Sequence, residues 1–187
     1  MNPSRITRRR TRSRPGDPLR WLCLVLFAFA SRAADSTPRG GVEGFEIARP
    51  GRTFEFPRDH GSHPEFSIEW WYITGHARSG QGAEARDFGF QITFFRTRVE
   101  GTQQMQSRFA ARHLLFAHAA VTEVQGRRFW HDQRIARAGF EVGQAGESDT
   151  DLRLRDWSLV RAANGSYQAR IAGTDFALDL SFTPTQE

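Results

Sequence analysis

The sequence predicts an all-β domain, folded either as a lipocalin-like antiparallel β-barrel or as a strongly curved sandwich of about eight strands. Apolar and polar residues alternate in several segments, most clearly over 88–95 and 175–182. Alternation with a period of two is typical of half-buried antiparallel strands. Turn-forming residues separate these segments, and Gln133–Phe140 is the only stretch with even a modest helical pattern.

The expected strands follow one another at short intervals along the chain. In order they are Thr53–Phe56, Phe66–His76, Phe88–Phe95, His113–Val124, Arg127–Trp130, Asp151–Val160, Tyr167–Ile171 and Phe176–Phe182. Asn164-Gly165 lies just before the seventh of them and is the strongest hairpin signal in the chain. Strands of this number and length fit an up-and-down barrel around a ligand cavity, or a sandwich.

Residues 1–33 predict a signal peptide. Eight arginines accompany a single acidic residue there, and an apolar run from Trp21 to Ala30 precedes small residues at a cleavage site after Ala33. This order is typical of a secretory signal, and the apolar run is too short to span a bilayer comfortably. An uncleaved N-terminal anchor is the alternative. We expect an exported bacterial protein, periplasmic or secreted, with no transmembrane segment once the signal is removed.

The leader also carries the features that make the whole chain look basic. All 26 basic residues are arginines. Without the leader, 18 arginines and 20 acidic residues remain, which gives a formal net charge of −2. A nucleic-acid partner is therefore not expected. Cys23, the one cysteine, lies in the leader, which excludes thiol catalysis, disulfides and cysteine zinc sites from the remainder. Residues 34–50 are expected to form a lead-in loop, and 51–187 the folded domain.

The densest cluster of polar and aromatic residues runs from Pro57 to His76. It holds three candidate catalytic residues, Glu69, Asp59 and His60, and four candidate ligand-binding residues, His63, Trp70, Trp71 and Tyr72. Strand alternation puts Glu69 and Trp71 on one face and the other two aromatic residues on the opposite face. If the first face lines a cavity, apolar surroundings would raise the pKa of Glu69 and make it a proton donor. Alternatively, Glu69 pairs with an arginine such as Arg96.

Three further features leave two interpretations each. His60 and His63 either chelate a metal together with Asp59 or organise the loop; the second is favoured, and no metal or other cofactor is predicted. His118, in an apolar strand, is either a satisfied interior residue or a ligand contact. Gln91, on the opposite face from Phe90, allows the same two interpretations. Sequence motifs for serine hydrolases, nucleotide binding and zinc proteases are absent.

Several blocks of this sequence, taken in order, resemble the AttH-type lipocalin-like family, which includes the bacterial carotenoid 1,2-hydratases. These blocks are Pro57–Pro64, Glu69–His76, Phe88–Arg96, Phe116–Ala120, Phe129–His131 and Asp156-Trp157. The resemblance implies two lipocalin-like domains in a protein about twice this length, so that 51–187 corresponds to the N-terminal domain and the second is absent or truncated. It also implies hydrophobic ligands, and for some members a link to ABC-type export systems.

Two functions from different classes follow. The first is an exported lipocalin-like domain that binds a hydrophobic small molecule, for which the resemblance implies an association with an ABC-type transporter. The second is a cofactor-free hydratase, isomerase or cyclase, or a secreted hydrolase, acting on a polyene or related hydrophobic substrate. Hydration of an alkene needs a general acid, a cavity that stabilises a cation, and a positioned water. The aromatic faces at positions 70–72 would stabilise such a cation.

Overall fold

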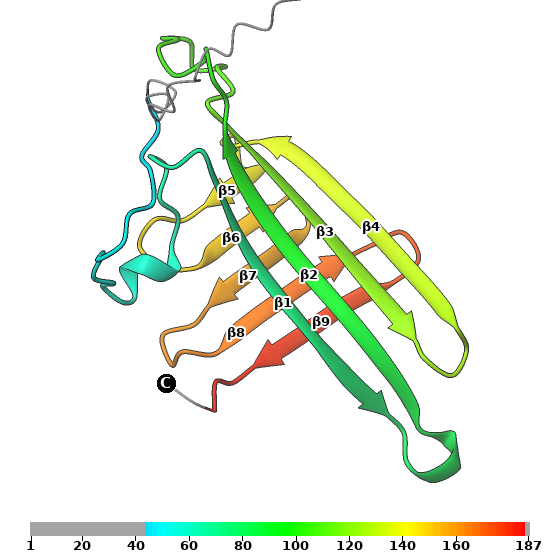
Figure 1. The fold of residues 1–187 in the computed structure, drawn as a ribbon. Coiled ribbons are helices and arrows are strands. Elements are labelled where there is room, and N and C mark those ends of the chain that lie inside the picture. The colour runs from blue at the N-terminus through cyan, green and yellow to red at the C-terminus, as the bar shows by residue number, and fades with distance from the viewer. Residues whose placement is uncertain (1–43, 186–187) are drawn as a thin grey trace, which may run out of the picture. The chain divides into compact units, whose positions relative to one another are not determined.

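Two antiparallel sheets make up the domain, which the computed structural model describes over residues 44–185 (Figure 1). The first sheet contains, in spatial order, β1 (Ile68–Ser79), β2 (Arg86–Arg98), β3 (His113–Glu123) and β4 (Arg128–Arg137). The second contains, also in spatial order, β5 (Gly143–Ala145), β6 (Asp151–Leu154), β7 (Trp157–Arg161), β8 (Tyr167–Ala172) and β9 (Ala177–Phe182). Within each sheet every strand pairs with its neighbour in sequence, as expected for a meander.

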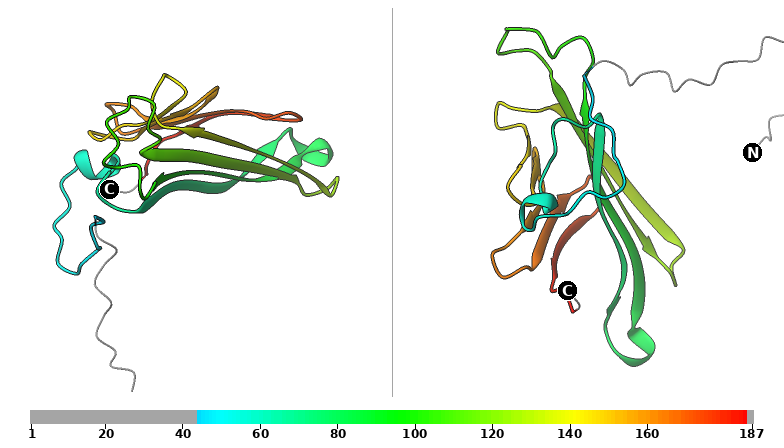
Figure 2. Two further views of the ribbon diagram at one scale, coloured as in Figure 1. Left: turned by 90° about the horizontal axis from the view of Figure 1, so that it is seen from above. Right: turned by 60° about the vertical axis from the view of Figure 1, so that its left-hand side comes forward.

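The two sheets lie face to face, as the further views show (Figure 2). Their facing sides share one apolar cluster. From the first sheet it takes Ile92, Phe94, Leu115, Ala117 and Ala119, and from the second Leu152, Leu154, Trp157, Leu159, Ala169 and Ile171. The fold is therefore a sandwich, one of the two predicted architectures. In the described part of the chain no closed barrel forms, because the strands divide into two separate sheets.

Alternation in the sequence corresponds to the two faces of the first sheet. On β1, Glu69, Trp71 and Ile73 are half-buried, whereas the residues between them are exposed. The inward side chains of β2 include Phe94 and Ile92, both essentially fully buried. The predicted strands at 66–76, 88–95, 113–124 and 176–182 are thus confirmed, with boundary shifts of a few residues.

Two predicted strands were wrong, and the one stretch with a modest helical pattern is not helical. Thr53–Phe56 forms no strand; it lies in the loop before the short 3-10 helix η1 (Arg58–His60), with all four side chains exposed and Phe54 stacked on Phe56. Gln133–Phe140 forms no helix. Its first half is the end of β4, where pairing with β3 from Gln133↔His118 to Arg137↔Leu114 outweighs the weak helical pattern.

The predicted strand Asp151–Val160 is in fact a hairpin. Arg155 adopts a left-handed conformation, with φ of 57°, so the chain reverses between β6 and β7. The hairpin predicted at Asn164-Gly165 is confirmed between β7 and β8. There the Asn164 side chain accepts hydrogen bonds from the backbone and the hydroxyl of Ser166, and Gly165 has a φ of 82°.

The predicted signal peptide at 1–33 and the first part of the lead-in loop lie outside the described residues. Over 44–50 the chain forms no named strand, and one isolated bridge joins Glu46 to Phe66. No helix within residues 44–185 has the length and apolar character needed to cross a membrane.

Candidate functional site

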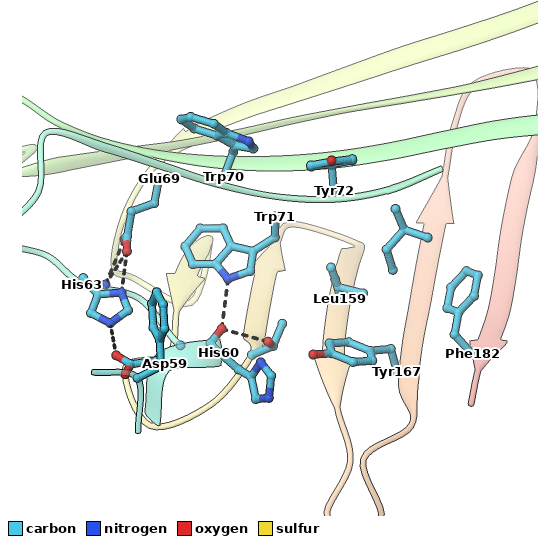
Figure 3. Close-up of a pocket in the computed structure, with 14 residues that line it drawn as sticks. Asp59, His60, His63, Glu69, Trp70, Trp71, Tyr72, Leu159, Tyr167 and Phe182 are labelled. Carbon is cyan, nitrogen blue, oxygen red and sulfur yellow. Dashed lines mark hydrogen bonds and ion pairs between the residues drawn. The ribbon is translucent and has the colours of Figure 1, made fainter. Parts of the chain in front are cut away.

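A pocket of about 980 Å³ opens between β1, the loop containing η1 and strands β7–β9 of the second sheet (Figure 3). Its walls are mostly aromatic and aliphatic, with Trp71, Ile73, Leu159, Tyr167 and Phe182 contributing from four strands. Its polar groups gather at one end, where the loop crosses the start of β1. They belong to Asp59, His60, His63, Glu69 and Thr150.

Asp59, His63 and Glu69 form a hydrogen-bonded row at this polar end (Figure 3). The imidazole Nε2 of His63 lies 2.7 Å from Asp59 Oδ1, and its Nδ1 lies 2.8 Å from Glu69 Oε1. Both ring nitrogens of His63 therefore lie at hydrogen-bond distance from a carboxylate oxygen. The backbone N–H of His63 and the hydroxyl of Ser62 also donate to Glu69.

A buried arginine completes the row behind Glu69. Arg96 is 2 % exposed, and its Nε donates to Glu69 Oε2 at 2.8 Å. Its Nη2 donates to the carbonyls of His63 and Phe66, both at 2.9 Å, and its Nη1 lies 3.1 Å from His113 Nδ1. Every nitrogen of this guanidinium therefore has a partner. The predicted alternative, in which Glu69 pairs with Arg96, is confirmed.

The surroundings hold both carboxyl groups in the ionised form. Desolvation by burial raises the pKa of Glu69, but the His63 backbone N–H and the Arg96 guanidinium outweigh it, so the pKa lies below its ordinary value. The expectation of a raised pKa was thus wrong, because the group facing Glu69 is a charged, hydrogen-bonding arginine. The Glu55 N–H and the His63 ring lower the pKa of Asp59 to about 2. Burial and the Arg96 cation lower the pKa of His113.

The loop is fastened to both sheets through main-chain groups. The His60 carbonyl accepts from Trp71 Nε1 on β1 at 3.0 Å and from Thr150 Oγ1, just before β6, at 2.9 Å. Ser62 N–H donates to the Gly146 carbonyl at 2.7 Å. At Gly61 a Cβ would stand 2.5 Å from the Glu147 carbonyl oxygen, so only glycine fits there. The loop is thus held by the main-chain carbonyl of His60 and by the ring of His63.

The predicted site residues divide between this pocket and the outer face of the first sheet. Trp71 points into the pocket, whereas Trp70 and Tyr72 lie at its edge, on the other side of β1, 57 % and 63 % exposed (Figure 3). Gln91 and His118 belong to that outer face and do not line the pocket. Gln91 donates to Thr93, and the His118 ring stacks on Phe95. The odd-even alternation of β2 already separates Gln91 from the inward-facing Phe90 and Ile92.

Several pocket residues escaped the sequence analysis. Thr150, Leu159, Tyr167 and Phe182 come from the second sheet and the loop before it, about 80 to 110 positions after Glu69 in the chain. The inward alternation of the last strand was the only signal for Phe182. For the others, nothing local in the sequence indicates that the two sheets meet there.

Hydrogen bonds hold the polar row together. Among residues 44–185 no group of three or more His, Cys, Asp or Glu side chains is arranged to hold a metal ion. Both ring nitrogens of His63 already lie at hydrogen-bond distance from a carboxylate. What the site offers chemically is a fixed, charge-compensated end to a largely apolar pocket.

Acid should weaken the fold through Asp59. Its carboxylate is ionised down to a pKa of about 2 in the folded protein, against 3.8 ordinarily, so it stabilises the fold above about pH 4, and this contribution is lost as the pH falls toward 2. We expect Asp59→Asn to be less stable than the wild type at neutral pH, with the difference shrinking between pH 4 and pH 2. Urea unfolding at each pH measures it. Asp179→Asn, at an exposed position, is the control. A stability difference between the wild type and Asp59→Asn that stays constant with pH would contradict the lowered pKa of Asp59.

Comparison with known proteins places the chain in a family. A search of curated proteins finds no match. A crystal structure from Nitrosomonas europaea, provisionally named AttH, is 40% identical, with a TM-score of 0.64; the match covers 76% of this chain and 42% of that one. The chain thus spans less than half the length of this relative. The family model described as AttH-like matches residues 47–187. This chain therefore belongs to the AttH-like family.

Proposed function

We propose that this domain is exported and binds a hydrophobic small molecule in the pocket between β1 and strands β7–β9. The observation that carries the proposal is the pocket itself, about 980 Å³ with aromatic and aliphatic walls and a few fixed polar groups at one end. Binding sites for small molecules commonly combine these properties. Export rests on the basic, apolar and small-residue segments of the first 33 residues.

Binding is favoured over the alternative of a cofactor-free hydratase, isomerase or cyclase. Protonation of an alkene needs a group that holds a proton at neutral pH and can release it to carbon. The lowered pKa values of Asp59 and Glu69 keep both carboxyl groups ionised, so neither of these two of the three candidate catalytic residues is such a donor. Incorporation of solvent deuterium into a ligand recovered from the protein would contradict a role limited to binding.

The protein purified from its native source provides the first experiment. Intact mass measures the mature N-terminus, which we expect at Ala34, and mass spectrometry of an organic extract identifies a co-purified ligand. A retained leader would contradict the proposed export, and an extract without any ligand would weigh against binding.

A substitution that fills the pocket tests where the ligand lies. Ile73 faces inward on β1 and lines the pocket, whereas its neighbour Thr74 is exposed on the other face. We expect Ile73→Trp to weaken binding of the neutral fluorescent probe N-phenyl-1-naphthylamine at least tenfold, because the indole occupies the space of the probe. Thr74→Trp, the control, should leave binding unchanged. Equal affinities for both variants, with near-ultraviolet circular dichroism confirming their fold, would refute this location.

A further inference from the structure

We propose that the ligand pocket continues past a pair of phenylalanines into a second apolar chamber, and that the natural ligand is an uncharged lipid with one long chain. This proposal rests on the binding function proposed above. The second chamber has a volume of about 410 Å³ and lies between the same two sheets, further along β1. Its walls come from all four strands of the first sheet and from β9.

The order of residues along the strands shows that the two chambers are parts of one inter-sheet space. On β1 the inward residues Glu69, Trp71 and Ile73 line the first chamber and Ala77 lines the second. On β9 the inward Phe182 lines the first, and Leu178 and Leu180 line the second. With a strand rise of about 3.3 Å per residue, Glu69 and Ala77 are roughly 26 Å apart. The continuous space is therefore long and narrow rather than round.

Phe90 and Phe182 stand at the boundary between the chambers. Their ring centroids are 6.0 Å apart. Phe90 pairs in register with Gly75 on β1, and a Cβ on Gly75 would stand 2.7 Å from Cζ of the Phe90 ring. The missing side chain thus lets the ring lie across β1. A side-chain ring can rotate, so this pair is a movable partition and not a wall of backbone.

The charges at the polar end select the head group. The residues lining the first chamber include the carboxylates of Asp59 and Glu69, whereas no arginine or lysine from the described part of the chain lines it. Arg96, Arg52 and the His63 ring are already engaged with those carboxylates. An anionic head group would therefore lose its hydration at this end without finding a free positive partner. A hydroxyl or another uncharged group can instead exchange hydrogen bonds with the carboxylates and with Thr150 or Tyr167.

Competition with N-phenyl-1-naphthylamine measures the chain length that the protein accommodates. The competitors are octan-1-ol, hexadecan-1-ol and hexadecanoate, each below its aggregation limit. Each buried methylene raises affinity about fourfold, so a chain that enters both chambers should bind at least about a hundredfold more tightly as hexadecan-1-ol than as octan-1-ol. Hexadecanoate should bind at least about tenfold more weakly than the alcohol of the same length at pH 7.

Ala77→Trp tests the second chamber independently of the first, because Ala77 lines only the second. The indole fills the space around Ala77, so the advantage of hexadecan-1-ol should fall below about tenfold while the affinity for octan-1-ol stays unchanged. Ala83→Trp, in the exposed β1–β2 connection, is the matched control and should keep the full advantage. An unchanged affinity for octan-1-ol also shows that the Ala77→Trp variant is folded.

The possible outcomes distinguish the two proposals. Binding of octan-1-ol without a gain for the longer alcohol, or a gain that survives Ala77→Trp, overturns the second chamber but leaves the binding function standing. Tighter binding of hexadecanoate than of the alcohol overturns the assignment of an uncharged head group. Absence of binding by every competitor and by the probe overturns both the chamber and the function.

Discussion

Arg96→Met is expected to lower the free energy of unfolding by about 3–5 kcal/mol, the range found when one partner of a buried ion pair is removed. Methionine preserves most of the apolar length of the side chain, so the change removes mainly the charge and the donors. Glu69 then keeps its desolvation but loses the cation 2.8 Å away, and the carbonyls of His63 and Phe66 each lose a donor. Urea denaturation at pH 7 measures the loss.

The pH dependence of this variant identifies the cause. Without Arg96 the desolvation of Glu69 is less opposed, so its pKa rises, and the carboxyl group takes up a proton more readily in the folded variant than in the wild type. The stability difference should therefore shrink as the pH falls below about 4.5. Adding Glu69→Gln to the variant should recover part of the loss, because it removes the uncompensated charge.

An exposed arginine is the control for this experiment. Arg170, whose side chain is 69% exposed, lies 3.6 Å from Asp179 on the surface of the second sheet. Arg170→Met should change stability by less than about 0.5 kcal/mol. A loss of under about 1 kcal/mol for Arg96→Met would mean that the buried network contributes little to folding, contrary to its hydrogen-bond geometry.

The Glu69–Arg96 pair shows how far the sequence reaches into this site. The alternation around Glu69 and Trp71 predicts correctly that both face inward, and Arg96 was one of two interpretations for the environment of Glu69. Choosing between them requires the register of β1 against β2, which places Glu69 directly opposite Arg96. Because the pattern of period two tolerates any shift by two residues, the sequence alone does not decide the partner. The pKa of Glu69 was expected to rise in a cavity and is in fact lowered, a difference that follows from this one uncertainty.

Strand predictions succeeded where a local pattern had no competitor and failed where a turn or distant pairing decided the structure. Phe88–Phe95 alternates strictly and lies in β2, since nothing within it favours another conformation. At the turn between β6 and β7 an arginine, Arg155, adopts the left-handed conformation that glycine or asparagine usually adopts. The sequence contains no glycine, proline or asparagine there that would predict a turn. At Gln133–Arg137 the partner strand β3 supplies the decisive hydrogen bonds from positions 114–118.

The sequence does not predict which residues of the second sheet line the pocket, for a related reason. Tyr167 and Leu159 line the same pocket as Trp71 only because the second sheet packs across the first, and packing of two sheets depends on the sum of many apolar contacts. The sequence reveals which residues of each strand face inward. It does not reveal which inward face meets which.

Trp157→Ala is expected to cost about 3–5 kcal/mol, the range for truncating a large buried aromatic residue. Trp157 is 0% exposed in the cluster that joins the two sheets, and its Nε1 donates to the Ala172 carbonyl at 2.8 Å. Alanine leaves a cavity that cannot be filled without moving the sheets, and it removes one of the two donors to the Ala172 carbonyl, which also accepts from Arg134 Nη2. Trp157→Phe should lose less, because a ring remains and mainly the hydrogen bond disappears.

A second tryptophan provides a control with the same chemical change. Trp70 is 57% exposed on the outer face of β1, so Trp70→Ala should cost at most about 1 kcal/mol, mostly through its cross-strand contact with Phe95. Thermal and urea unfolding of the three variants test the ranking. Equal losses for Trp70→Ala and Trp157→Ala would show that the outer face is covered by another surface in solution. The ranking therefore tests both the core between the sheets and the exposure of the face opposite to it.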